Sequence, residues 1–411
     1  MTATRMGRAA TLAVAVAVWC VCAWLLARTS VPSLHLSGLD QRGFFSAHEL
    51  ARTRAFTRGA DGLWLAGVVA ELVALVVLAR VLPRSVRTMG LGRIGAAIVV
   101  GMVMLVTLWA VGLPISLAGY WWDHHWGLGP FHVGSYLGAA WGTLWPEAVS
   151  VMAGIVLVVG LAGRFPRRWW LIAGPVIVAL AALFAFVGGW LSSSGHVLRN
   201  PVLRADVARL ERIEHVSGTP VRVQKVSSWT RQANAFTVGF GPSAHVVLWD
   251  TLLDGRFDRG QVDVVIAHEL GHVRSRHIIK AIGWSALIVL PTLWLLGLAT
   301  RRRGGVGDPA NLPYVLLVLV VLGLLTTPIQ NVVSRRYEAE ADWRALNATR
   351  DPAAAERLFQ SFARTSLQEP DPGILDYLWL ENHPTPMQRI AMTRAWSVRA
   401  GRSSRGGPGS P

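Results

Sequence analysis

The run His268-Glu269-Leu270-Gly271-His272 decides how the rest of the sequence is interpreted. Two histidines four residues apart lie on one face of a helix, one turn apart. Both imidazole rings can therefore reach one tetrahedral metal ion at about 2.0–2.1 Å. The intervening Glu269 can approach the open position of that ion and take a proton from a bound water. The alternative interpretation is a helix with two ordinary surface histidines.

The residues before this run predict the helix that it requires. Val262, Val265 and Ile266 form an apolar stripe at helical spacing, so we expect a helix over Arg259–His277.

A catalytic zinc site takes three protein ligands and leaves the fourth position to water. Glu338, in the helix-forming run Ser334–Asp342, is the candidate third ligand. Asp342 lies four residues later on the same face and is placed to hydrogen-bond the far nitrogen of a metal-bound histidine. Glu340 fits a solvated, charged helix start better than Glu338 does. We therefore predict one Zn²⁺ per chain, held by His268, His272 and Glu338.

The composition points to a bilayer as part of the solvent. Of the 411 residues, 52% are hydrophobic and only 16% are charged, whereas a soluble domain carries about a quarter charged residues. The net charge of +16 comes almost entirely from arginine, because Lys225 and Lys280 are the only lysines. These arginines lie between apolar stretches, as at membrane flanks, so we expect a lipid bilayer and no nucleic acid as partner. Cys20 and Cys22 both lie in the first apolar stretch, which excludes a cysteine metal site.

Seven apolar stretches approach the roughly 20 residues that a helix needs to cross a membrane. The fourth is short and has an earlier possible start at Val133. The first follows Arg5 and Arg8, so a secretory signal competes with a membrane anchor, which we favour because the run is long and other spans follow. The stretches are Ala9–Ala27, Leu63–Leu82, Ile94–Tyr120, Ala148–Ala162, Trp170–Leu191, Ile282–Thr300 and Leu312–Pro328.

These stretches predict a mainly α-helical, multi-pass protein of the cell membrane in three parts. Residues 1–191 form a transmembrane region of about five spans, and residues 397–411 form a disordered tail rich in Gly, Ser, Pro and Arg. Residues 192–396 form the metal-binding region, which includes spans six (282–300) and seven (312–328). Within it we expect a small β-sheet and further helices. The expected elements are strands Val221–Val226, Ala235–Phe240 and His245–Trp249, helix Leu203–His215, and a helix opened by Asp351-Pro352.

These runs resemble a known family. The chain is similar to the type I CaaX prenyl endopeptidases, which are integral-membrane zinc proteases, and more distantly to HtpX-type heat-shock proteases. Those enzymes pair the H-E-x-x-H helix with a later E-x-x-A-D helix, here Glu338-Ala339-Glu340-Ala341-Asp342. The run Asn234–Gly241, followed by Val246–Leu253, looks like their N-A-F/Y strand and V-L-x-D-T-L-L segment. His383-Pro384-Thr385-Pro386 with Arg389 looks like their H-P-x-x-x-R-I ending.

The resemblance implies a gluzincin-type zinc metalloendopeptidase that hydrolyses peptide bonds of membrane-associated or unfolded polypeptides. It assigns Glu338 as third ligand and Glu269 as general base. It also implies that Asn234 and Ala235 belong to an edge strand that pairs with the substrate backbone. The alternative for Asn234 is an ordinary turn residue.

Further roles also follow from the resemblance. It gives His383 as a donor to the developing oxyanion and Arg389 as the residue that orders the loop of His383. A structural His-Pro turn is the alternative for both. Ala339 and Glu340 depart from the usual Tyr and Gln of the CaaX-type enzymes, which leaves substrate preference open.

Ionisable residues near the apolar stretches allow two interpretations. Glu71 lies in the second stretch, and Asp123, His124 and His125 follow the third. The resemblance implies that they line an aqueous chamber between the spans. The alternative for the Asp-His-His cluster is an interfacial loop capped by Trp121, Trp122 and Trp126.

Two other function classes remain open. A protease-derived membrane sensor would normally carry an appended ligand-binding domain, and none is visible. A non-catalytic membrane scaffold or transporter is disfavoured by the intact Glu269, since a retired site would tolerate its loss. The sequence does not indicate an oligomeric state.

Two arguments disagree about which side of the membrane the metal site faces. Short basic loops stay in the cytoplasm, and the loop after span three has no Lys or Arg, so the charge argument places the catalytic segment outside. The resemblance implies a site that faces the cytoplasm. We favour the charge argument. The basic loops follow spans two, four and six and carry Arg84, Arg87, Arg93, Arg164, Arg167, Arg168, Arg301, Arg302 and Arg303.

Overall fold

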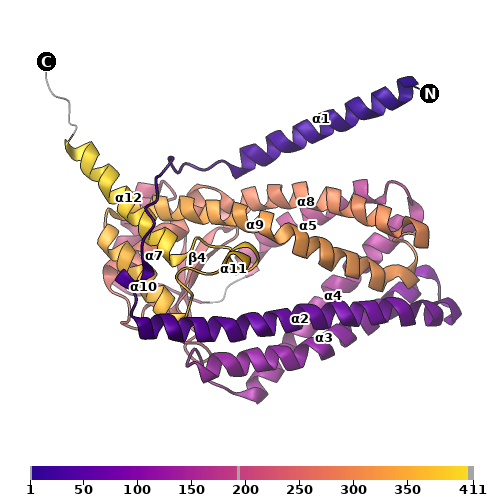
Figure 1. Ribbon diagram of the computed structural model, residues 1–411, viewed down its shortest axis with the longest axis horizontal. Coiled ribbons are helices and arrows are strands. Elements are labelled where there is room, and N and C mark those ends of the chain that lie inside the picture. The colour runs from indigo at the N-terminus through magenta and orange to yellow at the C-terminus, as the bar shows by residue number, and fades with distance from the viewer. Residues whose placement is uncertain (1, 192–194, 406–411) are drawn as a thin grey trace.

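The computed structural model describes residues 2–191 and 195–405 as a mainly α-helical molecule with one small sheet (Figure 1). Within these residues, six helices are long and apolar enough to cross a membrane. Apolar residues on all faces of these helices are what a bundle surrounded by lipid requires. These helices are α2 (Ala47–Thr88), α3 (Arg93–His125), α4 (Val133–Arg164), α5 (Trp169–Leu191), α8 (His277–Thr300) and α9 (Leu312–Thr349).

The first apolar stretch is helical, but the prediction of seven spans is not confirmed. It forms α1 (Thr2–Ala27), whose described apolar part is Ala13–Ala27. That part is shorter than the roughly 20 residues of a span. Figure 1 shows α1 at an angle to α8, and the indole nitrogen of Trp19 donates to the carbonyl of Leu287 at 2.9 Å. The count of candidate spans in the described chain is therefore six.

The fourth span begins early and the seventh ends late. Helix α4 starts at Val133, the earlier of the two starts that the sequence offered. Helix α9 extends without a break from its apolar half, past Pro328, to Thr349. The same helix therefore crosses the membrane and carries the run that contains Glu338.

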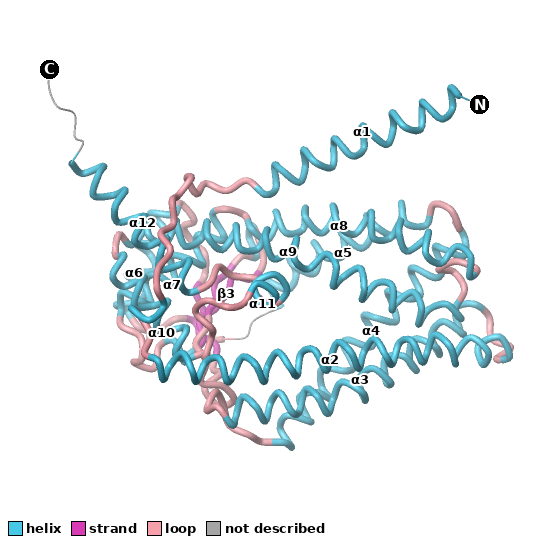
Figure 2. Tube along the Cα trace, in the orientation of Figure 1, coloured by secondary structure: helices cyan, strands magenta, loops and turns pink. Residues whose placement is uncertain are grey.

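The remaining helices gather at one end of the bundle, around the sheet (Figures 1 and 2). Most of them contribute to a hydrophobic core that also includes residues of α9 and of the sheet. Its fully buried side chains include Leu210, Ile266, Leu270, Leu346, Leu358 and Ile390. The helices are α6 (Pro201–Glu214), α7 (Arg259–Arg274), α10 (Pro352–Thr365), α11 (Ile374–Trp379) and α12 (Pro386–Arg405).

The sheet has four strands in the order β1-β2-β4-β3, with β2 and β4 parallel and the other pairs antiparallel. Strand β3 is therefore an edge. It ends at Val238, before the predicted Phe240, because Gly239 has φ +73° and a Cβ there would clash with the carbonyl of Ser243. Strand β4 matches its predicted range. The strands are β1 (His196–Val197), β2 (Val221–Gln224), β3 (Ala235–Val238) and β4 (His245–Trp249).

Three helix boundaries can be compared with the sequence. Helix α10 opens as predicted, with the carboxylate of Asp351 accepting the Ala354 N–H at 2.9 Å. The single helix expected over Arg259–His277 is wrong. It breaks at Arg276, which has φ +54° in the left-handed region, and α8 then begins at His277. Helix α12 continues to Arg405, so residues 397–405 are helical where we predicted disorder, and residues 406–411 lie outside the described residues.

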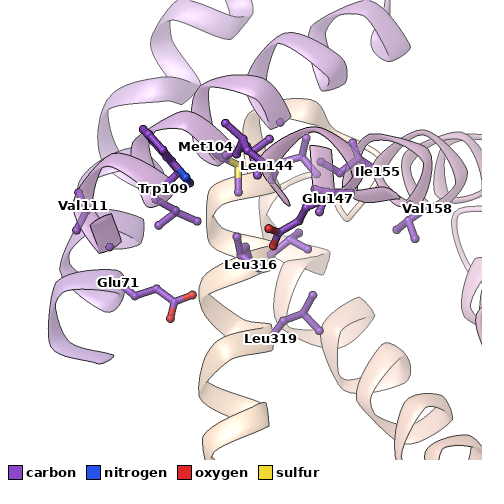
Figure 3. A pocket seen from close by; sticks show the side chains of 18 of the residues that line it. Glu71, Met104, Trp109, Val111, Leu144, Glu147, Ile155, Val158, Leu316 and Leu319 are labelled. Atoms are coloured by element: carbon purple, nitrogen blue, oxygen red, sulfur yellow. The ribbon is translucent and has the colours of Figure 1, made fainter. Parts of the chain in front are cut away.

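A cavity of about 700 Å³ lies among α2, α3, α4 and α9 (Figure 3). Its wall is largely apolar, and the carboxylates of Glu71 and Glu147 are the acidic groups that line it. Glu71 therefore lies on a cavity wall, and the aqueous nature of the cavity stays a prediction. His125 instead stacks on Trp121 and Trp122 at the end of α3, as in the interfacial interpretation.

Candidate metal centre

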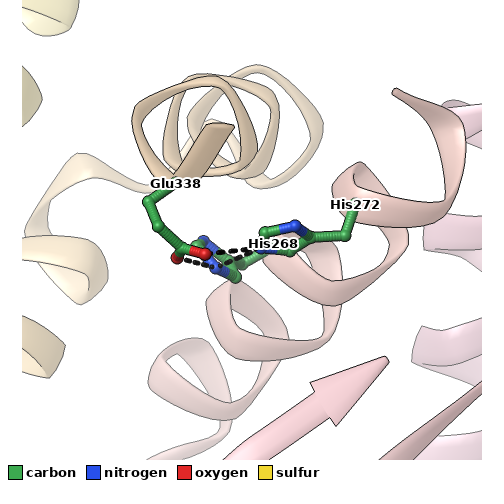
Figure 4. Close-up of side chains that lie close together, drawn as sticks. All are labelled: His268, His272 and Glu338. Atoms are coloured by element: carbon green, nitrogen blue, oxygen red, sulfur yellow. Dashed lines mark hydrogen bonds and ion pairs between the residues drawn. The ribbon is translucent and has the colours of Figure 1, made fainter. Parts of the chain in front are cut away.

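His268, His272 and Glu338 come together where α7 meets α9 (Figure 4). Nε2 of His268 lies 3.0 Å from Nε2 of His272 and 3.2 Å from a carboxylate oxygen of Glu338. Nε2 of His272 lies 3.5 Å from the other oxygen of Glu338. One atom from each of the three residues therefore faces a common point.

These separations fit a small tetrahedral cation. With ligand distances of about 2.0–2.1 Å, neighbouring donor atoms of such an ion lie roughly 3.3 Å apart. The observed separations of 3.0, 3.2 and 3.5 Å surround that value. Two ring nitrogens and a carboxylate are also the donor set that zinc accepts. The three residues therefore fit a divalent metal.

Small residues let the two helices approach closely at this point. A Cβ on Gly271 would lie 3.4 Å from the Cα and the carbonyl oxygen of Ala341, which is fully buried. Gly271 precedes His272, and Ala341 follows Glu338 by three residues. The Gly271–Ala341 contact therefore lies close to the candidate metal ligands on both helices.

Asp342 fixes the orientation of the His268 ring. Its Oδ1 lies 2.8 Å from Nδ1 of His268, and its side chain is almost fully buried. Arg389 on α12 binds both oxygens of the same carboxylate, with Nε donating to Oδ2 at 2.8 Å. The guanidinium of Arg389 therefore lies on Asp342, and its backbone N–H donates to the carbonyl of Thr385 at 2.9 Å.

The electrostatics of His268 favour a positive charge at this point. Burial opposes charging of the ring, but the carboxylates of Asp342 and Glu338 outweigh it and raise the pKa of His268 to about 10. A cation bound at Nε2 would replace that proton between the same carboxylates.

Glu269 lies beside the ligands and is buried. Its Oε2 accepts a hydrogen bond from the hydroxyl of Thr237 at 2.9 Å, and that hydroxyl is also 3.0 Å from the backbone carbonyl of Glu269. Thr237 belongs to β3, so the edge strand contacts the candidate base directly. Nothing in the sequence analysis singled out Thr237.

Asn234 and Ala235 lie at the start of this edge strand. The backbone carbonyl of Asn234 accepts the Trp249 N–H at 3.0 Å, which joins β3 to β4. The side-chain oxygen of the exposed Asn234 accepts the Ala235 N–H at 2.9 Å. The other edge of β3 has no neighbouring strand among the described residues. The two residues thus begin a strand edge that leads to Thr237 and Glu269.

His383 also faces the ligands, from a loop between α11 and α12. Its Nε2 lies 3.2 Å from an oxygen of Glu338. Partial burial lowers the pKa of its ring. The loop is held by Arg335, whose guanidinium donates to the carbonyls of Tyr377 and Glu381. Arg335 therefore holds the segment that leads to His383, and the suggested role of Arg389 in ordering this loop stays a prediction.

The expectation that Glu340 is solvated is wrong. The side chain is 3% exposed, and it accepts hydrogen bonds from the backbone N–H of Ser30 at 2.8 Å and from Lys280 at 3.3 Å. Its other neighbour is His277, which the sequence analysis did not single out. The signal was present, because a third histidine follows His272 after four residues.

The model described as "Peptidase family M48" matches residues 197–397. The uncharacterized metalloprotease YhfN of Bacillus subtilis (strain 168) is 28% identical over 244 residues, which are 56% of this chain and 57% of that protein. A protease HtpX homolog of Acidiphilium cryptum (strain JF-5) is 29% identical over 198 residues, which are 44% of this chain and 66% of that protein. The chain thus spans less than two thirds of the length of these relatives.

The fold has a solved counterpart in Ste24p of S. mikatae. The TM-score is 0.67, and the match covers 91% of this chain and 96% of that chain at 16% sequence identity. The six apolar helices and the relatives together make this a multi-pass membrane protein. The resemblance to membrane zinc metallopeptidases is thereby confirmed, and residues 197–397 are the part of the chain that matches peptidase family M48.

Proposed function

We propose that the protein is a membrane-embedded zinc metalloendopeptidase. The observation that carries this proposal is the convergence of His268, His272 and Glu338 on one point, with Glu269 beside them. The likeness to peptidase family M48 and to HtpX homologs supports the same activity. We further propose that residues 192–396 form the peptidase region and that residues 1–191 form the membrane region that supports it.

His268, His272 and Glu338 would hold the metal, which we take to be one Zn²⁺ per chain. When bound, zinc lowers the pKa of a coordinated water to about 7 and polarises a carbonyl oxygen. Asp342 accepts the hydrogen on Nδ1 of His268 and so keeps Nε2 free to bind the ion. Arg389 in turn holds Asp342 in place.

Glu269 would act as the general base and then as the acid. Its carboxylate takes a proton from the attacking water and gives it to the leaving amine. Thr237 orients the carboxylate through its hydroxyl. His383 would donate from Nε2 to the oxyanion that develops on the scissile carbonyl, because that nitrogen points toward the ligands.

The substrate would be a polypeptide in an extended conformation. The open edge of β3 offers backbone groups to an added strand, beginning at Asn234 and Ala235 and running toward Glu269. The place of the site beside a bundle of apolar helices favours membrane-associated or unfolded chains over folded soluble ones.

The test compares Glu269→Gln with His268→Ala in detergent-purified protein, using a quenched fluorescent unfolded polypeptide. Glu269→Gln should keep zinc and lose roughly 10²–10⁴-fold of the hydrolysis rate, because only proton transfer is removed. His268→Ala should lose both zinc and activity. The matched control is Glu356→Gln, which makes the same chemical change at a glutamate that pairs with Arg394. Unchanged turnover by Glu269→Gln would refute the mechanism.

A further inference from the structure

His272 has a ring neighbour of its own on the side away from the metal ligands. Its Nδ1 lies 2.9 Å from Nδ1 of His277, and the two rings meet edge to face. His277 is 4% exposed, and its Nε2 lies 3.1 Å from an oxygen of Glu340. The atoms therefore form a line from Glu340 through His277 to His272.

The protons along this line can be assigned from the chemistry of the rings. Only one of two facing Nδ1 atoms can carry the hydrogen between them. A histidine that binds metal through Nε2 keeps its hydrogen on Nδ1, so His272 is the donor and His277 the acceptor. His277 must then carry its own hydrogen on Nε2, where Glu340 accepts it. Glu340 thus selects the tautomer of His277 that can accept from His272.

Neighbouring residues hold His277 and Glu340 in place. The ring of His277 stacks on Tyr337, with centroids 4.7 Å apart and planes 11° from parallel. The left-handed turn at Arg276 brings His277 back against α7. Glu340 also accepts from the N–H of Ser30 and from Lys280. If His277 and Glu340 were exposed to solvent, water would compete for each of these hydrogen bonds and the ring could not be held in this way.

We propose that His277 and Glu340 are positioning residues for the metal ligand His272. The inference rests on the proposed metal site and deepens it. The two histidine ligands are then held differently: His268 bonds a carboxylate directly, whereas His272 reaches its carboxylate through a second imidazole.

The test measures zinc affinity by competition with a chelator, and the absorption spectrum of the Co²⁺-substituted protein. His277→Phe keeps a ring against Tyr337 but removes the acceptor for His272. It should weaken zinc binding by around 10–100-fold, as loss of a partner outside the ligands usually does, and should alter the Co²⁺ spectrum. His277→Gln retains an acceptor oxygen and should restore most of the affinity.

A second pair of variants tests the carboxylate. Glu340→Leu should weaken zinc binding in the same way, whereas Glu340→Gln keeps an acceptor oxygen and should retain most of the affinity. Thermal unfolding of the metal-free proteins separates a general loss of stability from a specific loss of metal. Asp342→Asn, which alters the partner of His268, is the benchmark for the size of the effect.

Two outcomes would overturn the positioning role, and a third would overturn the proposed metal site. Wild-type affinity and an unchanged Co²⁺ spectrum in both His277→Phe and Glu340→Leu would overturn the positioning role while leaving the metal site intact. Equal losses in the Gln and the apolar variants would also overturn it, because an acceptor would then make no difference. If the wild-type chain and His268→Ala held the same amount of zinc, the proposed site itself would be wrong.

Discussion

At the scale of single residues, Thr237 is the contact that ties the edge strand to the candidate base. Its hydroxyl donates to the carboxylate of Glu269 at 2.9 Å. A hydrogen bond to a charged group is worth about 1.5–3 kcal/mol, so Thr237→Val should lower kcat by roughly 10–100-fold while zinc content stays unchanged. Steady-state kinetics with metal analysis would measure both.

Thr237→Ser is the matched control, because it keeps the hydroxyl and should keep most of the activity. Equal rates for the Val and Ser variants would show that the hydroxyl does not orient the base.

The candidate ligands could be picked out from the sequence because their spacing alone defines a helix face. His268 and His272 need only a helix, and Glu338 and Asp342 need only a second one. Thr237 could not be found in this way, since it reaches Glu269 across 32 residues of chain. Glu340 was misjudged because Ser30, 310 residues away, covers it. Contacts of that kind depend on the assembled fold.

At the scale of elements, the crossing of α7 and α9 determines whether the ligands meet. Ala341 is fully buried against Gly271. Ala341→Leu would force extra methyl groups into this crossing, at a typical cost of about 1–3 kcal/mol. We expect a lower melting temperature and a disproportionate loss of bound zinc, measured by metal analysis of folded, detergent-purified protein.

Ala339→Leu, two residues earlier on the same helix and only half-buried, is the comparison. It adds the same volume away from Gly271 and should keep its zinc. Full zinc retention in Ala341→Leu would mean that the small-residue contact does not set the ligand spacing.

Helices α6 and α7 are joined by charges that make stability depend on pH. Asp263 accepts from Arg209 at 2.8 Å, but burial, together with the negative charge of Asp206, raises the pKa of Asp263 from 3.8 to about 6. The folded state then holds this proton more tightly than the unfolded state. Its contribution to stability is complete below about pH 4 and is lost as the pH rises through about 6.

The variant Asp263→Asn should not lose stability as the pH rises through about 6, and its amide still offers an oxygen to Arg209. Relative to the wild type, the variant should gain on the order of 1–3 kcal/mol between about pH 4 and about pH 7. Melting temperatures of both proteins across that range would test it. A difference between them that does not change with pH would contradict the raised pKa.

The elements themselves were largely predictable, and the exceptions have local causes. Hydropathy located the spans, and the Asp351-Pro352 cap located the start of α10. The break at Arg276 was missed because a non-glycine residue in the left-handed region carries no sequence signal. Strand β1 was missed because His196–Val197 is too short to show alternation.

At the scale of the whole molecule, the bundle has two distinct ends. The loops that join α2 to α3, α4 to α5 and α8 to α9 lie at the end opposite the metal centre (Figure 1). These are the arginine-bearing loops, so the charge argument places them in the cytoplasm and the metal centre outside. In a background with Cys20 and Cys22 replaced by Ser, Ser403→Cys should react with a membrane-impermeant reagent in intact cells.

Arg302→Cys, at the other end of the bundle, is the reciprocal control and should react only after lysis. Labelling in the reverse order would place the metal centre in the cytoplasm and overturn the charge argument.

Helix α9 is continuous from the bilayer to Glu338, and this gives the molecule a mechanical lever. Pro328 cannot complete the helical hydrogen bonding and is a natural bending point. Ten residues at 1.5 Å each separate it from Glu338, so a tilt of about 5° there moves the ligand by about 1.3 Å. A change in bilayer thickness tilts a span, and would thus pull one ligand relative to the two on α7. In vesicles of increasing acyl-chain length, the hydrolysis rate should therefore peak at one bilayer thickness. A rate that does not change with thickness would mean that tilting of α9 does not move Glu338.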